Sequence, residues 1–183
     1  YWYDVNDNKK TWTNKQIVQR SCGKFRREWE TSSMKEKSYT PENYPILRYG
    51  DVLLMLAEAE NEAHQGPTDL AYECINEIRQ RAGISKLEGL SYTDFQQAVR
   101  DERARELCFE SLRKYDLVRW GIYVEAVHDK LGAATQDKRW ATGNQFIGAR
   151  DYAARTQEKH QFLPIPTKEL DVNGKLEQNK YWQ

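Results

Sequence analysis

The chain has 183 residues, enough for one domain with a hydrophobic core, and 39% of its residues are hydrophobic while 31% are charged. Lys plus Arg equals Asp plus Glu at 28 each, so the net charge of zero gives no electrostatic case for binding nucleic acid or an anionic membrane. The sequence holds no run of about 18 apolar residues, so none of it is predicted to span a bilayer.

The N-terminal segment, residues 1–43, is predicted to be irregular and partly β. Residues 1–5 show a weak alternation of side-chain character that is typical of a strand. Asn6–Lys10 is a cluster of turn-forming residues, and Thr11–Thr13 is the predicted return strand of a hairpin. Residues 23–30 read as another short strand. Because residues 1–5 read as the inside of a strand without a start, we expect the chain to be a piece of a longer protein.

Aromatic side chains of this segment are the candidate ligand-binding residues. Trp2, Tyr3, Trp12 and Trp29 lie in the same N-terminal segment as Asn6, Asp7 and Asn8. An exposed ring stacks on the C–H face of a sugar, and neighbouring amides and carboxylates bind its hydroxyls. Trp140 is a further candidate in a later polar stretch. The alternative is that these rings fill the seam between loops and helices, as aromatic residues of large cores do.

The remainder, residues 44–183, is predicted to be helical and starts with a pair of helices. Residues 46–65 carry a broad apolar surface, and Gly66–Pro67 is predicted to end that helix. Thr68 is the predicted N-cap of a second helix, which ends at Gly83. Two antiparallel helices on so short a connection form a hairpin of about the size of a tetratricopeptide-type repeat.

A second pair of helices is predicted to follow. Ser91 caps a helix that runs to about Glu110, and residues 112–131 form the next one with a break near Gly121. Residues 132–162 are predicted to be a long polar loop. The predicted fold class is mainly α, with stacked helical hairpins of tetratricopeptide-like type, irregular loops and a few short β-strands. Such stacks provide a scaffold or a partner-binding surface.

Three glutamates, Glu102, Glu106 and Glu110, have the spacing of one helical face. A carboxylate pair for glycoside hydrolysis or a metal site is one interpretation. The other is a lattice of ion pairs that joins helix to helix. Alternating charge favours the lattice, because nearby cations lower the pKa of a carboxyl group. A carboxyl with a lowered pKa is poorly suited to act as a general acid. The nearby cations are Arg103, Arg113 and Arg119. Arg48, ahead of the first helix, is likewise expected to pair with a helix carboxylate, and no catalytic residue is assigned.

Histidines and cysteines show no metal-ligand or redox spacing, so no metal and no cofactor is expected. The histidines are scattered at His64, His128 and His160. The cysteines are odd in number, at Cys22, Cys74 and Cys108, and are predicted to be free buried thiols. No phosphate-binding glycine loop or nucleophile elbow is present.

Four segments resemble the C-terminal region of the SusD/RagB family. Tyr44–Glu62 looks like the family's helix opening, Pro-Ile-x-Arg-Tyr followed by Ala-Glu-Ala, and Ile75–Gly83 is similar to its Asn-x-Val-Arg-x-Arg-Ala-Gly. Glu102–Gly121 resembles Glu-Arg-x-x-Glu-Leu-x-Phe-Glu-Gly-x-Arg-x-x-Asp-Leu-x-Arg-Trp-Gly, and residues 163–181 resemble the family's ending. One departure is Ser111, where the family usually has glycine, so we expect the backbone there to tolerate a side chain.

The resemblance implies a protein that captures glycans at the bacterial cell surface without catalysis and is not an enzyme. It implies a TonB-dependent, SusC-like outer-membrane transporter as partner, and an outer-membrane location through a lipid anchor that lies outside this chain. It also implies that the chain is about the C-terminal third of its protein. The matched motifs belong to the scaffold, so no binding residue is carried over from the family.

Two other interpretations remain open from the residues. The first is a helical-repeat module that binds a protein partner or captures peptides and has no glycan affinity, and the helical periodicity fits it equally well. The second is a hydrolase that uses Glu102 or Glu106. It requires that the purified protein releases sugar and that a Glu106→Gln variant does not.

Overall fold

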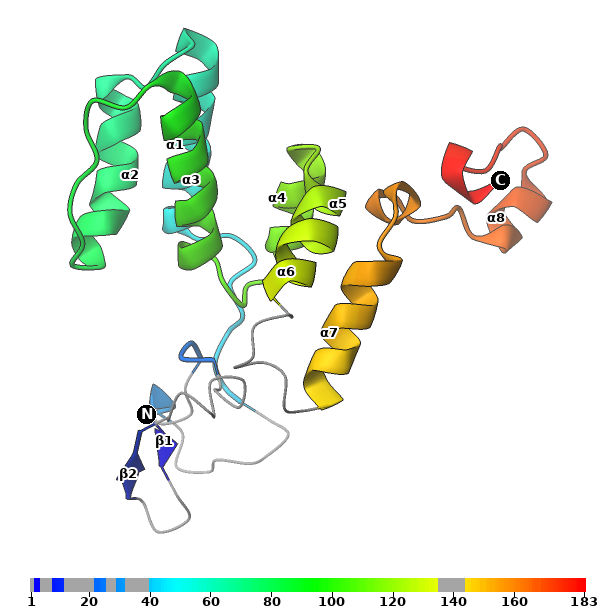
Figure 1. Ribbon diagram of the computed structural model, residues 1–183, viewed down its shortest axis with the longest axis horizontal. Coiled ribbons are helices and arrows are strands. Elements are labelled where there is room, and N and C mark those ends of the chain that lie inside the picture. The colour runs from blue at the N-terminus through cyan, green and yellow to red at the C-terminus, as the bar shows by residue number, and fades with distance from the viewer. Residues whose placement is uncertain (1, 4–7, 12–21, 26–28, 32–39, 135–143) are drawn as a thin grey trace. The chain divides into compact units, whose positions relative to one another are not determined.

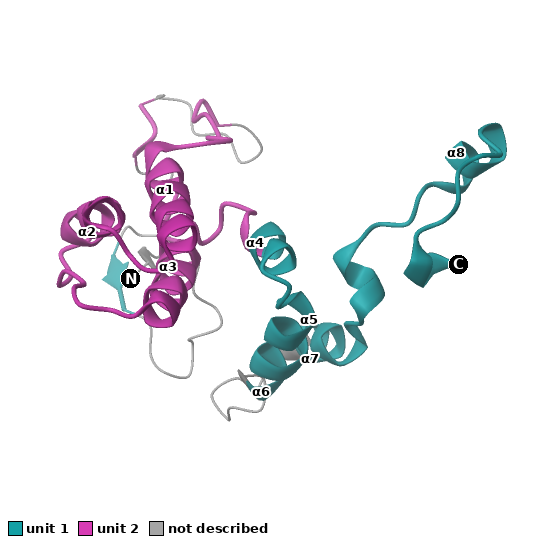
Figure 2. Cartoon of the chain, turned by 90° about the horizontal axis from the view of Figure 1, so that it is seen from above, with its two compact units in different colours: residues 1–21, 114–183 teal, residues 22–113 magenta. Residues whose placement is uncertain are grey.

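A computed structural model describes residues 2–3, 8–11, 22–25, 29–31, 40–134 and 144–183. The chain divides into two compact units, residues 22–113 and residues 1–21 with 114–183 (Figure 2). Each unit is considered by itself below. The described residues are mainly helical, so the predicted fold class is confirmed.

Three helices build the unit of residues 22–113: α1 (Tyr49–His64), α2 (Asp69–Arg81) and α3 (Tyr92–Glu106). α1 and α2 run antiparallel, and α1 packs along both α2 and α3 (Figure 1). The predicted first hairpin is therefore confirmed. The third helix ends at Glu106, four residues before its predicted end at Glu110.

Local sequence signals explain where these helices begin and end. The hydroxyl of Thr68 accepts a hydrogen bond from the backbone N–H of Ala71 at 3.1 Å, which confirms the predicted N-cap. The hydroxyl of Ser91 caps α3 in the same way, because it accepts a hydrogen bond from the backbone N–H of Asp94 at 3.2 Å. The left-handed residue that ends α1 is Gln65, with φ of 53°, and not Gly66 as predicted. The chain thus turns one residue early, ahead of the Gly-Pro pair.

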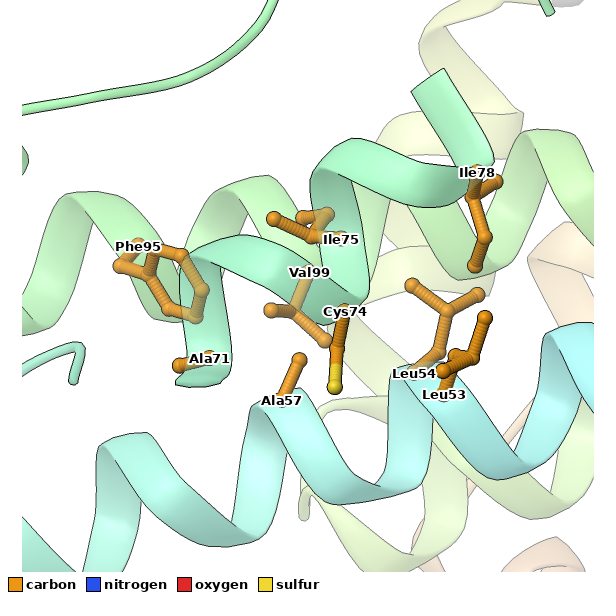
Figure 3. Close-up of a cluster of buried hydrophobic side chains, with 9 residues drawn as sticks. All are labelled: Leu53, Leu54, Ala57, Ala71, Cys74, Ile75, Ile78, Phe95 and Val99. Atoms are coloured by element: carbon orange, nitrogen blue, oxygen red, sulfur yellow. The ribbon is translucent and has the colours of Figure 1, made fainter. Parts of the chain in front are cut away.

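The core of this unit consists of small and medium apolar side chains that the three helices direct toward one another (Figure 3). Ala57 and Ala71 are fully buried where α1 faces α2, which lets the two helices approach closely. Leu54, Ile75 and Phe95 are fully buried as well. The other buried members are Leu53, Cys74, Ile78 and Val99.

Ion pairs join the helices of this unit beside the apolar core, so the predicted lattice is confirmed. Arg103 Nη1 lies 2.8 Å from Asp51 Oδ1, and both side chains are less than 10% exposed, at 5% and 8%. Arg79 Nη1 donates to Glu102 Oε2 at 2.7 Å, which ties α2 to α3. Charges this far removed from water are expensive unless they are paired, so the pairs fix how the helices dock.

The C-terminal end of α3 is held by cations from three other segments. Arg48 donates to Glu106 Oε1 at 2.5 Å, to the Glu106 carbonyl at 2.6 Å and to Glu110 Oε2 at 2.7 Å. Lys24 donates to the same carbonyl at 2.6 Å and also pairs with Glu110. Arg81 pairs with the second oxygen of Glu106. Cations at a helix C-terminus are favoured by the helix dipole, and here they also bind an otherwise unpaired carbonyl.

The predicted pairing of Arg48 with a helix carboxylate is thereby confirmed, whereas Arg113 and Arg119 have other contacts. Arg113 Nη1 donates to the Arg100 carbonyl at 3.2 Å, and Arg119 pairs with Asp116 at 3.0 Å. Cations distant in sequence, rather than its closest neighbours, pair with Glu106.

The turn after α3 contains two residues in the left-handed region, Phe109 with φ of 64° and Ser111 with φ of 62°. Ser111 is accommodated as expected, but an L side chain there costs about 1–2 kcal/mol that glycine does not incur. We expect Ser111→Gly to raise the free energy of unfolding by about 0.5–1 kcal/mol after the entropy of the freer unfolded chain is subtracted. Urea titration checks this, with Ser111→Ala as the control that keeps the strain; equal stability of both variants contradicts it.

The second unit contains a run of short helices: α4 (Arg113–Arg119), α5 (Tyr123–Glu125), the π-helix η3 (Ala126–Leu131), α6 (Gly132–Ala134) and α7 (Asn144–Arg155). Gly121, with φ of 69°, separates α4 from α5, so the predicted break is confirmed. The loop predicted over residues 132–162 is wrong, because α7 occupies much of it. Phe146, Ala149 and Ala153 have helical spacing, but Gly148 and the polar residues of α7 obscure this pattern.

The core of this unit is a small cluster around Leu117, Tyr123 and Val127, all less than 10% exposed at 7%, 2% and 8%. Three short elements follow α7: the 3₁₀ turn η4 (Glu158–Gln161), α8 (Thr167–Val172) and the 3₁₀ turn η5 (Lys180–Trp182). An extended stretch precedes α8, as predicted. In the part of the chain that the structure describes, no helix is long and apolar enough to cross a membrane.

The β-structure is a single short antiparallel hairpin among the described residues. β1 (Trp2–Tyr3) pairs with β2 (Lys9–Lys10), with Trp2 opposite Lys10. The return strand thus precedes the predicted Thr11–Thr13. The strand predicted over residues 23–30 is wrong for its described residues, which form a bend and a 3₁₀ turn. The division into segments 1–43 and 44–183 stays a prediction.

All three cysteines are free thiols, as predicted. Cys74 is buried in the core of the three-helix unit, whereas Cys22 and Cys108 are only partly buried. Burial, followed by the charges of nearby glutamates, raises the pKa of the Cys74 thiol. Its protonated form is a poor nucleophile, which suits a residue that fills space.

Candidate functional site

The aromatic residues predicted from the sequence are only partly within the described structure. Trp29 is 61% exposed in a short 3₁₀ turn. The backbones of Trp2 and Tyr3 form β1, but their side chains lie outside the described part, as do Trp12 and Trp140 entirely. This predicted site stays a prediction.

The structure reveals a different aromatic site, a cavity of about 490 Å³ in the unit that ends the chain. Its volume falls within the range of small-molecule sites, about 300–1,000 Å³. Side chains from α4, α5, α7 and the C-terminal segment line it: Lys114, Tyr123, Gly148, Asp151, Tyr152, Arg155, His160, Phe162, Leu163, Pro164 and Trp182. A more open hollow of about 570 Å³ on α2 is lined mostly by charged and amide side chains, and Tyr72 is the aromatic residue of its lining.

Hydrogen bonds hold the rings of the cavity in place. The indole N–H of Trp182 donates to the carbonyls of Lys159 at 3.1 Å and Phe162 at 3.0 Å. The Trp182 ring meets His160 edge to face, with centroids 6.1 Å apart. Phe162 remains 53% exposed and Tyr152 51% exposed. The cavity therefore presents exposed ring surface beside an indole whose orientation is fixed by two hydrogen bonds.

A polar clamp positions the wall formed by Leu163 and Pro164. The side-chain amide of Gln178 accepts from the N–H of Ile165 at 2.8 Å and donates to its carbonyl at 2.9 Å. Asn179 donates to the carbonyl of Leu163 at 2.6 Å. These contacts fold the chain end back onto the cavity wall, and they give Gln178 and Asn179 a structural role within the segment that resembles the family's ending.

Tyr123 and Tyr152 share a hydrogen bond between their hydroxyls at the edge of the cavity. Burial, followed by the bond to Tyr152, raises the pKa of Tyr123 to about 12. Because the folded state keeps this proton, the contribution of Tyr123 to stability is full below about pH 10 and is lost as pH rises through about 12.

We therefore expect the free energy of unfolding to fall less steeply above pH 10 in Tyr123→Phe than in the parent. Urea titrations at several alkaline pH values measure this slope, and groups common to both proteins cancel in the comparison. Tyr115→Phe, which alters an exposed tyrosine outside the cavity, is the matched control. Parallel slopes for the parent and Tyr123→Phe contradict the assignment.

The chemistry available in the cavity suits binding. Its lining offers rings, hydroxyls, the cations Lys114 and Arg155, and one carboxylate, Asp151. Glycoside hydrolysis normally needs two carboxyl groups about 5–10 Å apart. Among the described residues, no group of three potential metal ligands comes together.

Glu102 and Glu106, the carboxylates of the hydrolase interpretation, lie in the unit of residues 22–113, where they form ion pairs with cations. Glu102 pairs with Arg79, and both oxygens of Glu106 are paired, with Arg48 and Arg81. These ion pairs occupy the carboxylate oxygens and tie the helices together, which supports a structural role for both glutamates.

Residue types and their spacing do not reveal the cavity, for two reasons. The sequence predicts a loop over residues 132–162, whereas α7 places Tyr152 and Arg155 three residues apart on one helical face. Trp182 is separated from Phe162 by α8 and its flanking turns, and only the backbone path brings them together. The helical spacing of Phe146, Ala149 and Ala153 was the signal that predicts α7.

Comparisons with known proteins agree with this architecture. The model of the SusD family matches residues 1–182. A SusD-like protein of Formosa agariphila is 40% identical over 139 residues, which is 74% of this chain and 23% of the relative. A second SusD-like protein of that organism is 29% identical over 148 residues, 75% of this chain and 25% of the relative.

Among solved structures, a SusD homolog from Bacteroides thetaiotaomicron has a TM-score of 0.68 and 37% identity, covering 84% of this chain and 30% of that one. A SusD superfamily protein from Bacteroides vulgatus has a TM-score of 0.57 and 31% identity, covering 80% of this chain and 28% of that one. The chain thus spans about a quarter of the length of the curated relatives it matches. The chain belongs to the SusD family.

Proposed function

We propose that the protein binds glycans at the bacterial cell surface without catalysis and delivers them to a TonB-dependent, SusC-like outer-membrane transporter. The observation that carries this proposal is the aromatic cavity beside α7. Membership in the SusD family supports it, because the family resemblance implies glycan capture, an outer-membrane location and a lipid anchor outside this chain.

The cavity suits a sugar because it combines ring faces with hydrogen-bonding groups at its rim. Phe162 and Tyr152 offer about half of their surfaces to solvent, at 53% and 51% exposed. A pyranose presents a C–H face that packs on such rings, while its hydroxyls need donors and acceptors. Asp151 and Arg155 supply one of each at the same cavity.

The aromatic residues predicted from the sequence are proposed as further contacts along a longer glycan. Trp29 is the described example, with 61% of its surface exposed. Trp2, Tyr3, Trp12 and Trp140 are proposed on the same grounds of residue type and sequence surroundings.

The test is calorimetric titration with purified plant, host and microbial glycans, using the protein in the form that its host makes. Phe162→Ala and Trp182→Ala are expected to weaken binding of the recognised glycan about five- to tenfold, which corresponds to about 1 kcal/mol or slightly more. Tyr115→Ala is the matched control, because Tyr115 is an aromatic residue 71% exposed outside the cavity. Chromatography of the recovered glycan is expected to show no cleavage.

Trp29→Ala tests the site predicted from the sequence in the same titration. Weaker binding in Trp29→Ala but not in the cavity variants assigns the glycan to the N-terminal segment. Weaker binding in the cavity variants alone assigns it to the cavity. If all variants bind as the parent does, both assignments are wrong.

A second candidate function is binding of a protein partner or peptide through α1. Its buried face carries Leu54, Ala57 and Asn61, while apolar side chains also line the opposite face. Those exposed residues are Tyr49 at 65%, Val52 at 41%, Met55 at 42% and Leu56 at 37%. An exposed apolar row of this kind is typical of a contact surface. Loss of partner binding in Met55→Asp, with glycan binding intact, is the result that this function predicts.

A further inference from the structure

The cavity beside α7 carries more positive than negative charge. Lys114 from α4 and Arg155 from the last turn of α7 are cationic, whereas Asp151 is its one carboxylate. Asp151 and Arg155 stand four residues apart on α7, a spacing that permits an ion pair. Among the described residues the two do not pair, so the guanidinium remains available to a ligand.

Lys114 and His160 are already oriented toward this cavity. The Nζ atom of Lys114 lies over the Tyr123 ring, 5.4 Å from its centroid. The Nδ1 atom of His160 accepts a hydrogen bond from the Gln157 N–H at 2.8 Å. Nδ1 is thereby used within the chain, and Nε2 is the ring nitrogen that is left for a ligand.

These groups match the needs of an acidic sugar better than those of a neutral one. A guanidinium binds a carboxylate or a sulfate through two parallel hydrogen bonds, and an ammonium adds a point charge. A neutral glycan can accept hydrogen bonds from the two cations, but it brings no negative charge to offset their desolvation. The rings of Phe162 and Trp182 form an apolar wall of the same cavity, against which the face of the sugar can pack.

We propose that this cavity binds an anionic sugar residue, either a uronate or a sulfate ester, with Arg155 as the main anion-binding residue and Lys114 as its second. This inference rests on the proposed glycan-binding function and specifies the class of glycan. The chemistry common to both sources is a negatively charged oxygen group on a pyranose ring.

The test is titration of the protein with matched pairs of oligosaccharides. One pair is oligogalacturonate and its methyl ester, and the other is a sulfated galactan oligosaccharide and its desulfated form. We expect the charged member of at least one pair to bind at least tenfold more tightly, with an affinity that falls as salt rises. The pair that shows the difference identifies the source of the negative charge.

The variant Arg155→Gln removes the charge and keeps a polar side chain on the exposed end of α7. We expect it to weaken binding of the charged oligosaccharide at least tenfold and to change binding of the neutral one less than twofold. Arg150→Gln is the matched control, because Arg150 is exposed on the same helix outside the cavity. Circular dichroism confirms that both variants are folded.

The outcomes separate this inference from the proposed function. If neutral glycans bind at the cavity as tightly as charged ones, or if Arg155→Gln binds the charged oligosaccharide as the parent does, the inference is wrong and glycan binding stands. If no glycan in the wider panel binds, both are wrong.

Discussion

Replacing Asp51 with alanine is expected to lower the free energy of unfolding by about 3–5 kcal/mol. The partner, Arg103, is 5% exposed and lies 2.8 Å from the Asp51 carboxylate. Without that carboxylate, the core between α1 and α3 retains a guanidinium whose main counter-charge is gone. The loss of a favourable charge in the first turn of α1 contributes at most about 1 kcal/mol of this effect.

Urea unfolding of Asp51→Ala and of Glu88→Ala measures the difference. Glu88 is an exposed acid between helices, and its removal is expected to change stability by less than about 0.5 kcal/mol. Asp51→Asn keeps the shape of the side chain but not its charge, so its cost is expected to fall between the two. A loss below about 1 kcal/mol for Asp51→Ala contradicts the conclusion that this pair fixes the docking of the helices.

Replacing Arg48 with methionine is expected to cost about 2–3 kcal/mol, because three hydrogen bonds that involve charged groups are lost together. The Glu110 side chain is 6% exposed and that of Glu106 9% exposed, so water replaces the guanidinium poorly. Arg48→Lys is expected to recover less than half of the loss, since an ammonium cannot form the fork that reaches both glutamates. Arg105→Met, which removes an arginine 61% exposed, is expected to cost less than about 1 kcal/mol.

The Arg48→Met variant is also expected to differ from the parent in the pH at which it unfolds in acid. Burial raises the pKa of the Glu110 carboxyl, but hydrogen bonds from Arg48 and Lys24 outweigh burial and hold that pKa below its usual range. A carboxyl lowered in this way stabilises the fold above its unfolded pKa of about 4.3, and this contribution is lost as pH falls through the lowered value. In Arg48→Met burial remains while one cation is gone, so acid unfolding is expected at a higher pH. Acid titrations of parent and variant that coincide contradict this role.

Much of the three-helix unit is predictable from the sequence because its signals are local. Thr68 and Ser91 are N-caps that act within one turn of their own helices. The apolar spacing of α1 and α2 predicts their shared core, and alternating charge predicts ion pairs. The identities of the partners are not predictable in this way, since Arg48 reaches Glu106 across 58 residues of sequence. Only the packing of α1 beside α3 brings them together.

The second unit and the cavity are less predictable for a related reason. α7 contains Gly148 and several polar residues, which weaken its apolar periodicity so far that the sequence predicts a loop there. The cavity is assembled from four separate segments, and its Trp182 is placed by hydrogen bonds to backbone carbonyls of Lys159 and Phe162. Backbone acceptors leave no trace in the sequence, so residue type and spacing alone do not reveal this site.

The most direct measurement is calorimetric titration of the folded protein with the glycan panel, in parent, Phe162→Ala and Arg155→Gln forms. We expect saturable binding of at least one glycan that is recovered intact, weaker binding in Phe162→Ala, and a selective loss of binding to acidic glycans in Arg155→Gln. Absence of binding to every glycan by the folded parent contradicts the proposed glycan-binding function and favours a protein partner on the exposed face of α1.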